Sequence, residues 1–213
     1  MGIARVLPGA WGWGLADPEK VLIGTVREPE TIRDRMELYG EFCSGMLEKA
    51  MQDVNPEFIY LSEPISHNNG PLISPDMFEE FVIPVYERIA ATARGPGCDN
   101  ILLSTYGDTS LPFPMLIDAG ITMLWISEAA ELPELDYRQI RSRFGPDLGL
   151  IGGIPLSVLR SESPDLIRNT LEGIVPPLLQ SGRYVPLAGV RVREEVLWSV
   201  YQCYREVLAE LIG

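Results

Sequence analysis

The sequence is poor in several residues that often carry protein chemistry. It contains one histidine, His67, and three widely separated cysteines, Cys43, Cys98 and Cys203, in 213 residues. No CxxC or Cys-His spacing occurs, so we expect neither a disulfide framework nor a structural zinc site. Reduced thiols of this kind are typical of cytoplasmic proteins, and we expect a cytoplasmic location.

Long apolar runs and positive charge are also scarce. No apolar run reaches the ~18 residues of a membrane span, and the N-terminus lacks the basic and hydrophobic order of a signal peptide. Acidic residues outnumber basic ones by 30 to 17, which gives a net charge of −13. This balance argues against a nucleic-acid or anionic-membrane surface. We therefore expect no nucleic-acid or membrane partner.

Short hydrophobic segments alternate with segments of helical spacing along most of the chain. Hydrophobic residues make up 46% of the sequence, which is enough to fill the core of one domain. The expected strands are residues 58–61, 100–104, 121–126, 148–151 and 183–187. The expected helices are residues 31–54, 75–89, 112–119, 135–144, 164–179 and 192–212. In the fourth helix, Arg138, Arg141 and Arg143 are expected on the solvent side. This alternation predicts an α/β fold with a parallel sheet.

Residues 1–29 differ from the rest of the chain because glycine and proline interrupt any helical spacing. We expect an irregular lead-in there, with one short strand at residues 21–26. Residues 30–213 would then form the α/β domain.

Polar side chains gather where the first two expected strands end. These candidates are Glu63, Ser66, His67, Ser104, Tyr106 and Asp108. Parallel α/β folds keep their chemistry at the carboxyl ends of strands. Glu63 could bind substrate or transfer a proton there, or it could be a solvated loop residue. His67 could contact substrate or be ordinary polar surface. Ser104 and Tyr106 could line a pocket, or belong to a turn that Asp108 caps.

The later strands also end at candidate residues. Glu128 is a second acid at a strand end. Gly152 and Gly153 have no side chain, so the backbone could approach a ligand or turn sharply. Arg191 follows the last strand, where a guanidinium could clamp a carboxylate or simply begin a solvent-facing helix.

Several segments resemble the uroporphyrinogen decarboxylase superfamily in their order and spacing. They are Glu63-Pro-Ile-Ser66, Leu72-Ile-Ser-Pro75, Phe78-Glu-Glu-Phe81 with Pro84, Leu102-Leu-Ser-Thr-Tyr-Gly107, Ala119-Gly120 and Leu150-Ile-Gly-Gly-Ile-Pro155. This superfamily joins the haem-pathway decarboxylase to corrinoid-dependent, zinc-containing methyltransferases. Its members are (β/α)8 barrels with the site at the carboxyl ends of the strands. The resemblance covers roughly residues 30–212.

The resemblance implies a barrel that this chain is too short to complete. A full barrel needs about 250 residues, and the sequence has five expected strands followed by helices. We therefore expect the C-terminal part of a TIM barrel, an incomplete barrel of about five parallel βα units.

An incomplete barrel exposes two sheet edges and an inner face. Strand residues such as Ile59, Leu61 and Leu103 would then face an open cleft. We expect self-association into a homo-oligomer, a missing N-terminal half-barrel, or coverage by the lead-in, whose Trp11 and Trp13 could plug the cleft.

The resemblance also implies a function. It predicts a decarboxylase-like lyase or methyltransferase-type enzyme acting on a tetrapyrrole, corrinoid or methylated small molecule, with corrinoid as candidate cofactor. Ser104 and Tyr106 stand where the methyltransferases carry zinc-binding His and Cys, so we expect no zinc. Glu63, Tyr106 and Glu128 are the catalytic candidates. The alternative is a non-catalytic accessory half-barrel that binds a corrinoid protein or a partner chain.

Overall fold

The computed structural model describes residues 3–6, 18–67, 69–127, 132, 135–189 and 192–213. The chain divides into two compact units, Met1–Met123 and Leu124–Gly213. Trp11, Trp13, Glu128 and Arg191 lie outside the described residues. Within the described ranges, none of the helices combines the length and apolarity needed to cross a bilayer.

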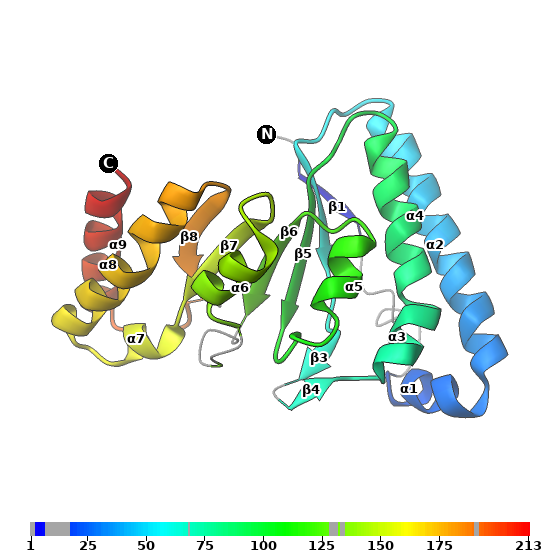
Figure 1. Cartoon of the computed structure of the whole chain (residues 1–213), viewed down its shortest axis with the longest axis horizontal. Coiled ribbons are helices and arrows are strands. Elements are labelled where there is room, and N and C mark those ends of the chain that lie inside the picture. Colours follow the sequence, from blue (N-terminus) through cyan, green and yellow to red (C-terminus); the bar gives the residue numbers. More distant parts are fainter. Residues whose placement is uncertain (1–2, 7–17, 68, 128–131, 133–134, 190–191) are drawn as a thin grey trace. The chain divides into compact units, whose positions relative to one another are not determined.

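The first unit is built on parallel strands that follow one another in the order β1, β2 and β5. These strands are β1 (Ile3–Val6), β2 (Phe58–Ser62) and β5 (Ile101–Tyr106), and β3 (Ser66–His67) pairs antiparallel with β4 (Gly70–Pro71). The helices are α1 (Pro18–Arg27), α2 (Pro29–Met51), α3 (Pro75–Phe81), α4 (Ile83–Arg94) and α5 (Phe113–Asp118). Helices α2 and α4 lie side by side along the strands (Figure 1).

The second unit has the same kind of alternation. Its strands are β6 (Met123–Ser127), β7 (Gly149–Ile154) and β8 (Tyr184–Ala188), in that order, and β7 pairs with β8 in parallel. Its helices are α6 (Tyr137–Phe144), α7 (Leu156–Arg160), α8 (Pro164–Ser181) and α9 (Trp198–Ile212). The core of this unit lies among α7, α8 and α9, where Leu159, Ile167 and Leu171 are fully buried.

The predicted α/β class is confirmed. All five expected strands are present, as β2, β5, β6, β7 and β8. The strands of neither unit close into a barrel, in agreement with the expected incomplete barrel. Strand β1 is an additional strand, and it lies at the edge next to β2.

The strand expected at residues 21–26 is wrong, because these residues belong to helix α1. Val21 and Thr25, four residues apart, are buried on one side of this helix. Helix α2 begins at Pro29, two residues earlier than expected, because proline has the φ angle of a first helical position.

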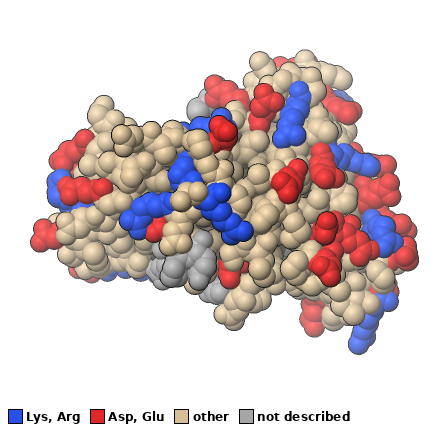
Figure 2. Space-filling view, viewed as in Figure 1, with Lys and Arg blue, Asp and Glu red and all other residues tan. Residues whose placement is uncertain are grey.

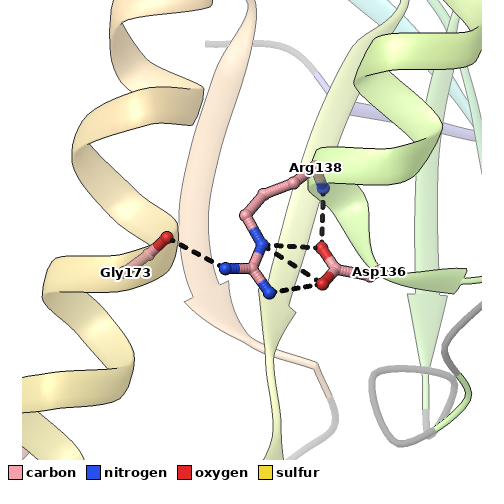
Figure 3. A network of polar contacts seen from close by, with 3 residues as sticks. All are labelled: Asp136, Arg138 and Gly173. Atoms are coloured by element: carbon pink, nitrogen blue, oxygen red, sulfur yellow. Dashed lines mark hydrogen bonds and ion pairs between the residues drawn. The ribbon is translucent and has the colours of Figure 1, made fainter.

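Helix α6 begins at a charged cap. The Asp136 carboxylate accepts a hydrogen bond from the backbone N–H of Arg138 (2.8 Å) and pairs with the Arg138 guanidinium. That guanidinium also donates to the carbonyl oxygen of Gly173 in α8, at 3.3 Å (Figure 3). The cap therefore joins the start of α6 to α8.

The expectation that Arg141 faces solvent is also wrong. Arg141 is buried, and its guanidinium donates to the carbonyl oxygens of Gly145 (2.7 Å) and Leu148 (2.6 Å). The loop after α6 turns its carbonyl groups inward and needs a buried donor there. Helical spacing gives the direction of a side chain but does not reveal such a need.

The faces of β2 and β5 are the reverse of those expected. Ile59, Leu61 and Leu103 do not face an open cleft, because each is at most 1% exposed. Side chains alternate along a strand, so Tyr60, Ser62 and the other residues of opposite parity belong to the other face. The apolar face is covered by the helices, at roughly 1.5–3 kcal/mol of stabilisation for each large side chain.

Candidate functional site

The carboxyl ends of β2 and β5 bring two of the predicted loops together. In the parallel register Ser62 is the partner of Ser104, and the backbone N–H of Glu63 donates to the Ser104 carbonyl oxygen at 2.9 Å. The candidates at Glu63 and Ser104 are thus neighbours, although 41 residues separate them in the sequence.

One face at these strand ends is open to solvent. Tyr60 and Ser62 of β2 share one strand face with Ser104 and Tyr106 of β5, where Ser62 is the partner of Ser104 and Tyr60 is the partner of Leu102, which is buried. Ser62 is exposed, Tyr60 and Ser104 are half-buried, and Tyr106 is 39% exposed. Two hydroxymethyl groups and two phenol rings therefore share an accessible surface, which we call the hydroxyl face.

Glu63 does not belong to the hydroxyl face. It continues the buried parity of Ile59 and Leu61, and it is only 4% exposed. Its charge acts on Tyr39 and Cys43 of α2 and on Tyr86 of α4. The structure therefore places this carboxylate on the helix side of the strands.

The groups around Glu63 hold their protons firmly. Burial raises the pKa of Tyr86 well above its usual value, and the charge of Glu63 adds to this shift. Burial also raises the pKa of the Cys43 thiol, although a hydrogen bond with Tyr39 opposes the change. Both phenols and the thiol are therefore neutral at pH 7, and the Tyr86 hydroxyl has no hydrogen-bond partner among the described residues.

The hairpin of β3 and β4 places Ser66 and His67 differently. Ser66 is fully buried, and its hydroxyl has no hydrogen-bond partner among the described residues. His67 is exposed, and its Nδ1 accepts a hydrogen bond from the backbone N–H of Asn69 at 3.0 Å. The sequence candidate His67 is thus a surface residue that stabilises its own turn.

The loop after β5 packs against this hairpin. The backbone N–H of Asp108 donates to the His67 carbonyl oxygen at 2.9 Å. Gly107 has a φ of +74°, and a Cβ there would lie 2.5 Å from the carbonyl carbon of His67. Asp108 accepts hydrogen bonds from the hydroxyl (2.6 Å) and the N–H of Ser110, so it caps a local turn.

Gly152 and Gly153 lie in the second unit, where aromatic side chains cover them. A Cβ on Gly153 would lie 2.7 Å from the ring of Tyr137, and one on Gly152 would lie 3.2 Å from Trp125. The Tyr137 hydroxyl donates to the carbonyl oxygen of Ile151 at 2.8 Å. The absence of a Cβ at these glycines thus leaves room for aromatic rings against the strand, and their contact with a ligand stays a prediction.

Sequence reasoning missed the residues that complete these arrangements. Tyr60 and Ser62 have a detectable signal, because they repeat at the two-residue spacing of Ser104 and Tyr106. Tyr137 has no such signal, since only the fold brings it to Gly153. Among the residues that the structure describes, no group of three or more His, Cys, Asp or Glu side chains could hold a metal ion.

Comparison with known proteins gives one result for most of the chain. The family model described as uroporphyrinogen decarboxylase (URO-D) matches residues 11–191. No curated protein matches the chain. The match includes the strand ends that form the hydroxyl face and the strand that carries Gly152 and Gly153.

Proposed function

Since the chain belongs to the uroporphyrinogen decarboxylase family, we propose that it binds a tetrapyrrole, corrinoid or methylated small molecule on the hydroxyl face. The observation that carries this proposal is the register that pairs Ser62 with Ser104. It sets two hydroxyls beside each other at the carboxyl ends of parallel strands, where α/β folds bind ligands.

A tetrapyrrole is the ligand that suits this face best. The rings of Tyr60 and Tyr106 offer apolar surface to a flat macrocycle, with a hydroxyl at the edge of each ring. The hydroxyls of Ser62 and Ser104 can donate to the carboxylates of the macrocycle and accept from its pyrrole N–H groups. A site of mostly apolar surface with a few polar groups is typical for such ligands.

Carboxy-lyase chemistry is favoured over thiol methylation. Loss of CO2 breaks a carbon–carbon bond, and the carbon left behind takes up a proton. Tyr106 carries an acidic hydrogen on the hydroxyl face and is the proposed donor. Methyl transfer to a zinc-bound thiol would need soft ligands, which serine and tyrosine do not supply.

The position of Glu63 favours a second candidate function. A buried carboxylate on the helix side of β2 is not on the face where substrate would bind. Because the hydroxyl face then lacks the Glu63 carboxylate, it could bind a tetrapyrrole, or the corrinoid of a partner protein, and catalyse no reaction. The chain would then be an accessory half-barrel.

A titration tests these proposals. The purified chain is titrated with coproporphyrin and with hydroxocobalamin, and the absorbance bands of the macrocycles are followed. We expect saturable binding that weakens about tenfold in Tyr106→Ala, whereas Trp198→Ala, an exposed aromatic position in α9, binds like wild type. The proposal would be refuted if neither coproporphyrin nor hydroxocobalamin binds to the chain.

A turnover assay separates the two functions. CO2 release from a reduced porphyrinogen carrying acetate groups would support the lyase, provided that Tyr106→Phe binds the porphyrinogen but releases little CO2. Binding without CO2 release would establish the accessory function.

A further inference from the structure

Glu63 is the only buried acid among the residues that the structure describes. Other Asp and Glu side chains lie at the surface, as Figure 2 shows for one face of the molecule. A carboxylate that bulk water does not reach needs hydrogen-bond donors around it. The groups beside Glu63 therefore indicate how the protein tolerates this charge.

Two buried hydroxyl groups have no hydrogen-bond partner among the described residues and lie on the same side of the strands as Glu63. They are the Tyr86 hydroxyl in α4 and the Thr105 hydroxyl in β5. Tyr86 is 1% exposed and Thr105 is 2% exposed. Leaving a buried hydroxyl unpaired costs free energy, so native proteins pair such groups with protein atoms or with an ordered water.

The register of β2 and β5 places Thr105 next to Glu63. The last paired residues of the two strands are Ser62 and Ser104. The ladder continues past them, because the backbone N–H of Glu63 donates to the Ser104 carbonyl oxygen. Side chains alternate along a strand, so Glu63 and Thr105, both buried, share the side that the helices cover.

Helix α4 brings Tyr86 to the same place. Its ring packs against Phe78 of α3, with the ring centroids 6.4 Å apart. Burial raises the pKa of Tyr86, and the charge of Glu63 adds to this rise, so the phenol lies near the carboxylate. Glu63 therefore has one hydroxyl beside it in the sheet and another in the helix layer.

The three groups have complementary hydrogen-bonding capacity. Each hydroxyl has a hydrogen to donate, whereas a carboxylate only accepts and offers about four lone-pair positions. Glu63 can therefore accept a hydrogen bond besides the contacts that it already makes. A small group that accepts from Tyr86 and Thr105 and donates to Glu63 would satisfy all three side chains.

A water molecule has this capacity, and a metal cation does not. The oxygen of water can accept from both hydroxyls while its hydrogens donate to acceptors. A sodium or potassium ion would bind the oxygens of Tyr86 and Thr105 but would leave both hydroxyl hydrogens unpaired. Buried waters typically make about three hydrogen bonds to otherwise unsatisfied polar groups, which matches the set around Glu63.

We propose that one buried water molecule is bound among the Glu63 carboxylate, the Tyr86 hydroxyl and the Thr105 hydroxyl. It accepts from both hydroxyls and donates to Glu63, and so ties the carboxylate to α4 and β5. Glu63 is thereby held on the helix side of the strands, away from the hydroxyl face. This site does not depend on the ligand proposed for the hydroxyl face.

A high-resolution crystal structure of the full chain tests the proposal directly. We expect one peak of electron density within about 2.6–3.2 Å of an oxygen atom of each of the three side chains. A direct hydrogen bond from Tyr86 or Thr105 to Glu63, with no peak between them, would overturn the proposal.

A salt comparison distinguishes water from a cation. The urea midpoint of the wild-type chain is measured in equal concentrations of sodium, potassium and tetramethylammonium chloride. We expect the same midpoint in all three salts, because a bound water does not respond to the identity of the cation. A higher midpoint in sodium or potassium chloride would show a bound metal ion and would overturn the proposal.

Substitutions test whether the two hydroxyls share one water. Tyr86→Phe and Thr105→Val keep the shape of each side chain but remove its hydroxyl. We expect each variant to lower the urea midpoint by roughly 0.5 M, because the remaining groups lose a partner. The double variant should lose clearly less than the sum of the two, since either substitution alone already disrupts the shared site.

The opposite result is equally well defined. If the hydroxyls bind nothing, removing a buried and unpaired polar group should raise the midpoint. A midpoint that rises or is unchanged in either variant, or losses that simply add in the double variant, would overturn the proposal. The control is Tyr201→Phe, at a partly exposed position of α9, which should leave the midpoint unchanged. Circular dichroism confirms that each variant is folded.

Discussion

The guanidinium of Arg141 donates a hydrogen bond of 2.8 Å to the backbone carbonyl oxygen of Gly182. The same group also donates to Gly145 and Leu148. One side chain of α6 thus ties together the turns that lead into β7 and β8. Burial lowers the pKa of Arg141, with a smaller contribution from the charge of Arg183. Arginine begins so far above neutrality that Arg141 stays charged.

Replacing Arg141 should therefore destabilise the protein. We expect Arg141→Met to lower the free energy of unfolding by about 2–4 kcal/mol, because several buried carbonyl oxygens lose their donor. Urea denaturation followed by circular dichroism measures the change. The control is Arg143→Met, since Arg143 is exposed and its guanidinium lies over the ring of Phe144. A loss no larger than that of the control would contradict the assigned role.

Gly153 should be intolerant of a side chain for two reasons. Its φ is +82°, and a Cβ would lie 2.7 Å from Tyr137. Gly145 has nearly the same φ, +83°, but open space around it. We expect Gly145→Ala to cost about 1–3 kcal/mol through backbone strain alone, and Gly153→Ala about 1–3 kcal/mol more through overpacking. Thermal unfolding compares the two. Equal losses would indicate that Tyr137 does not occupy this space.

The cap of α6 should make stability depend on acid pH. The hydrogen bonds from Arg138 lower the pKa of Asp136 in the folded state, and burial opposes them. The unfolded chain then binds a proton more readily, so the stabilisation is complete above the unfolded pKa of about 3.9 and is lost as pH falls through the folded pKa. With Arg138 half-exposed, we expect at most about 1 kcal/mol.

Urea titrations between about pH 3 and pH 6 test this dependence. Asp136→Asn keeps the cap to the Arg138 N–H but loses the charge. The stability difference from wild type should shrink below about pH 4, and Arg138→Gln should behave in the same way. A difference that is independent of pH would refute the interpretation.

The three thiols should react at different rates. Cys43 and Cys98 are buried, and burial raises the pKa of each. Cys203 is partly exposed. The thiolate is the reactive form, so we expect one thiol to react rapidly with a disulfide reagent at pH 7.5 and two only after unfolding. Mass spectrometry identifies the site, and Cys203→Ser should abolish the rapid phase. Rapid labelling of Cys43 in the folded chain would contradict the burial of the Cys43 side chain.

The success of the strand predictions has a local cause. The strands β2, β5, β6, β7 and β8 are short apolar runs between turn residues, and burial of such runs needs no knowledge of their neighbours. Helix α1 was missed because Gly24 weakens its pattern. In the structure Gly24 lies against Ile32, and there is no room for a Cβ, because a Cβ there would lie only 2.8 Å from the Cδ1 atom of Ile32. A close helix contact of this kind depends on a neighbouring segment.

The candidate site stays a prediction, and the sequence indicates where it would lie better than it indicates which face each residue occupies. Polar residues after parallel strands indicate the carboxyl end of a sheet, and the register joins Ser62 to Ser104 there. The face of each residue was harder to assign. Glu63 has the polarity of a site residue, yet it continues the buried parity of Leu61. Its phenol and thiol neighbours come from α2 and α4, which are distant in sequence.

The sequence by itself determined the α/β class, the order of the strands along the chain and the family resemblance, because each depends on local hydrophobic spacing or on short motifs. Only the tertiary structure decided which face Glu63 occupies, why Arg141 is buried and what fills the space at Gly153. Those outcomes depend on carbonyl groups and rings brought from remote segments. A buried charge or a missing side chain has no defined role until its spatial neighbours are in place.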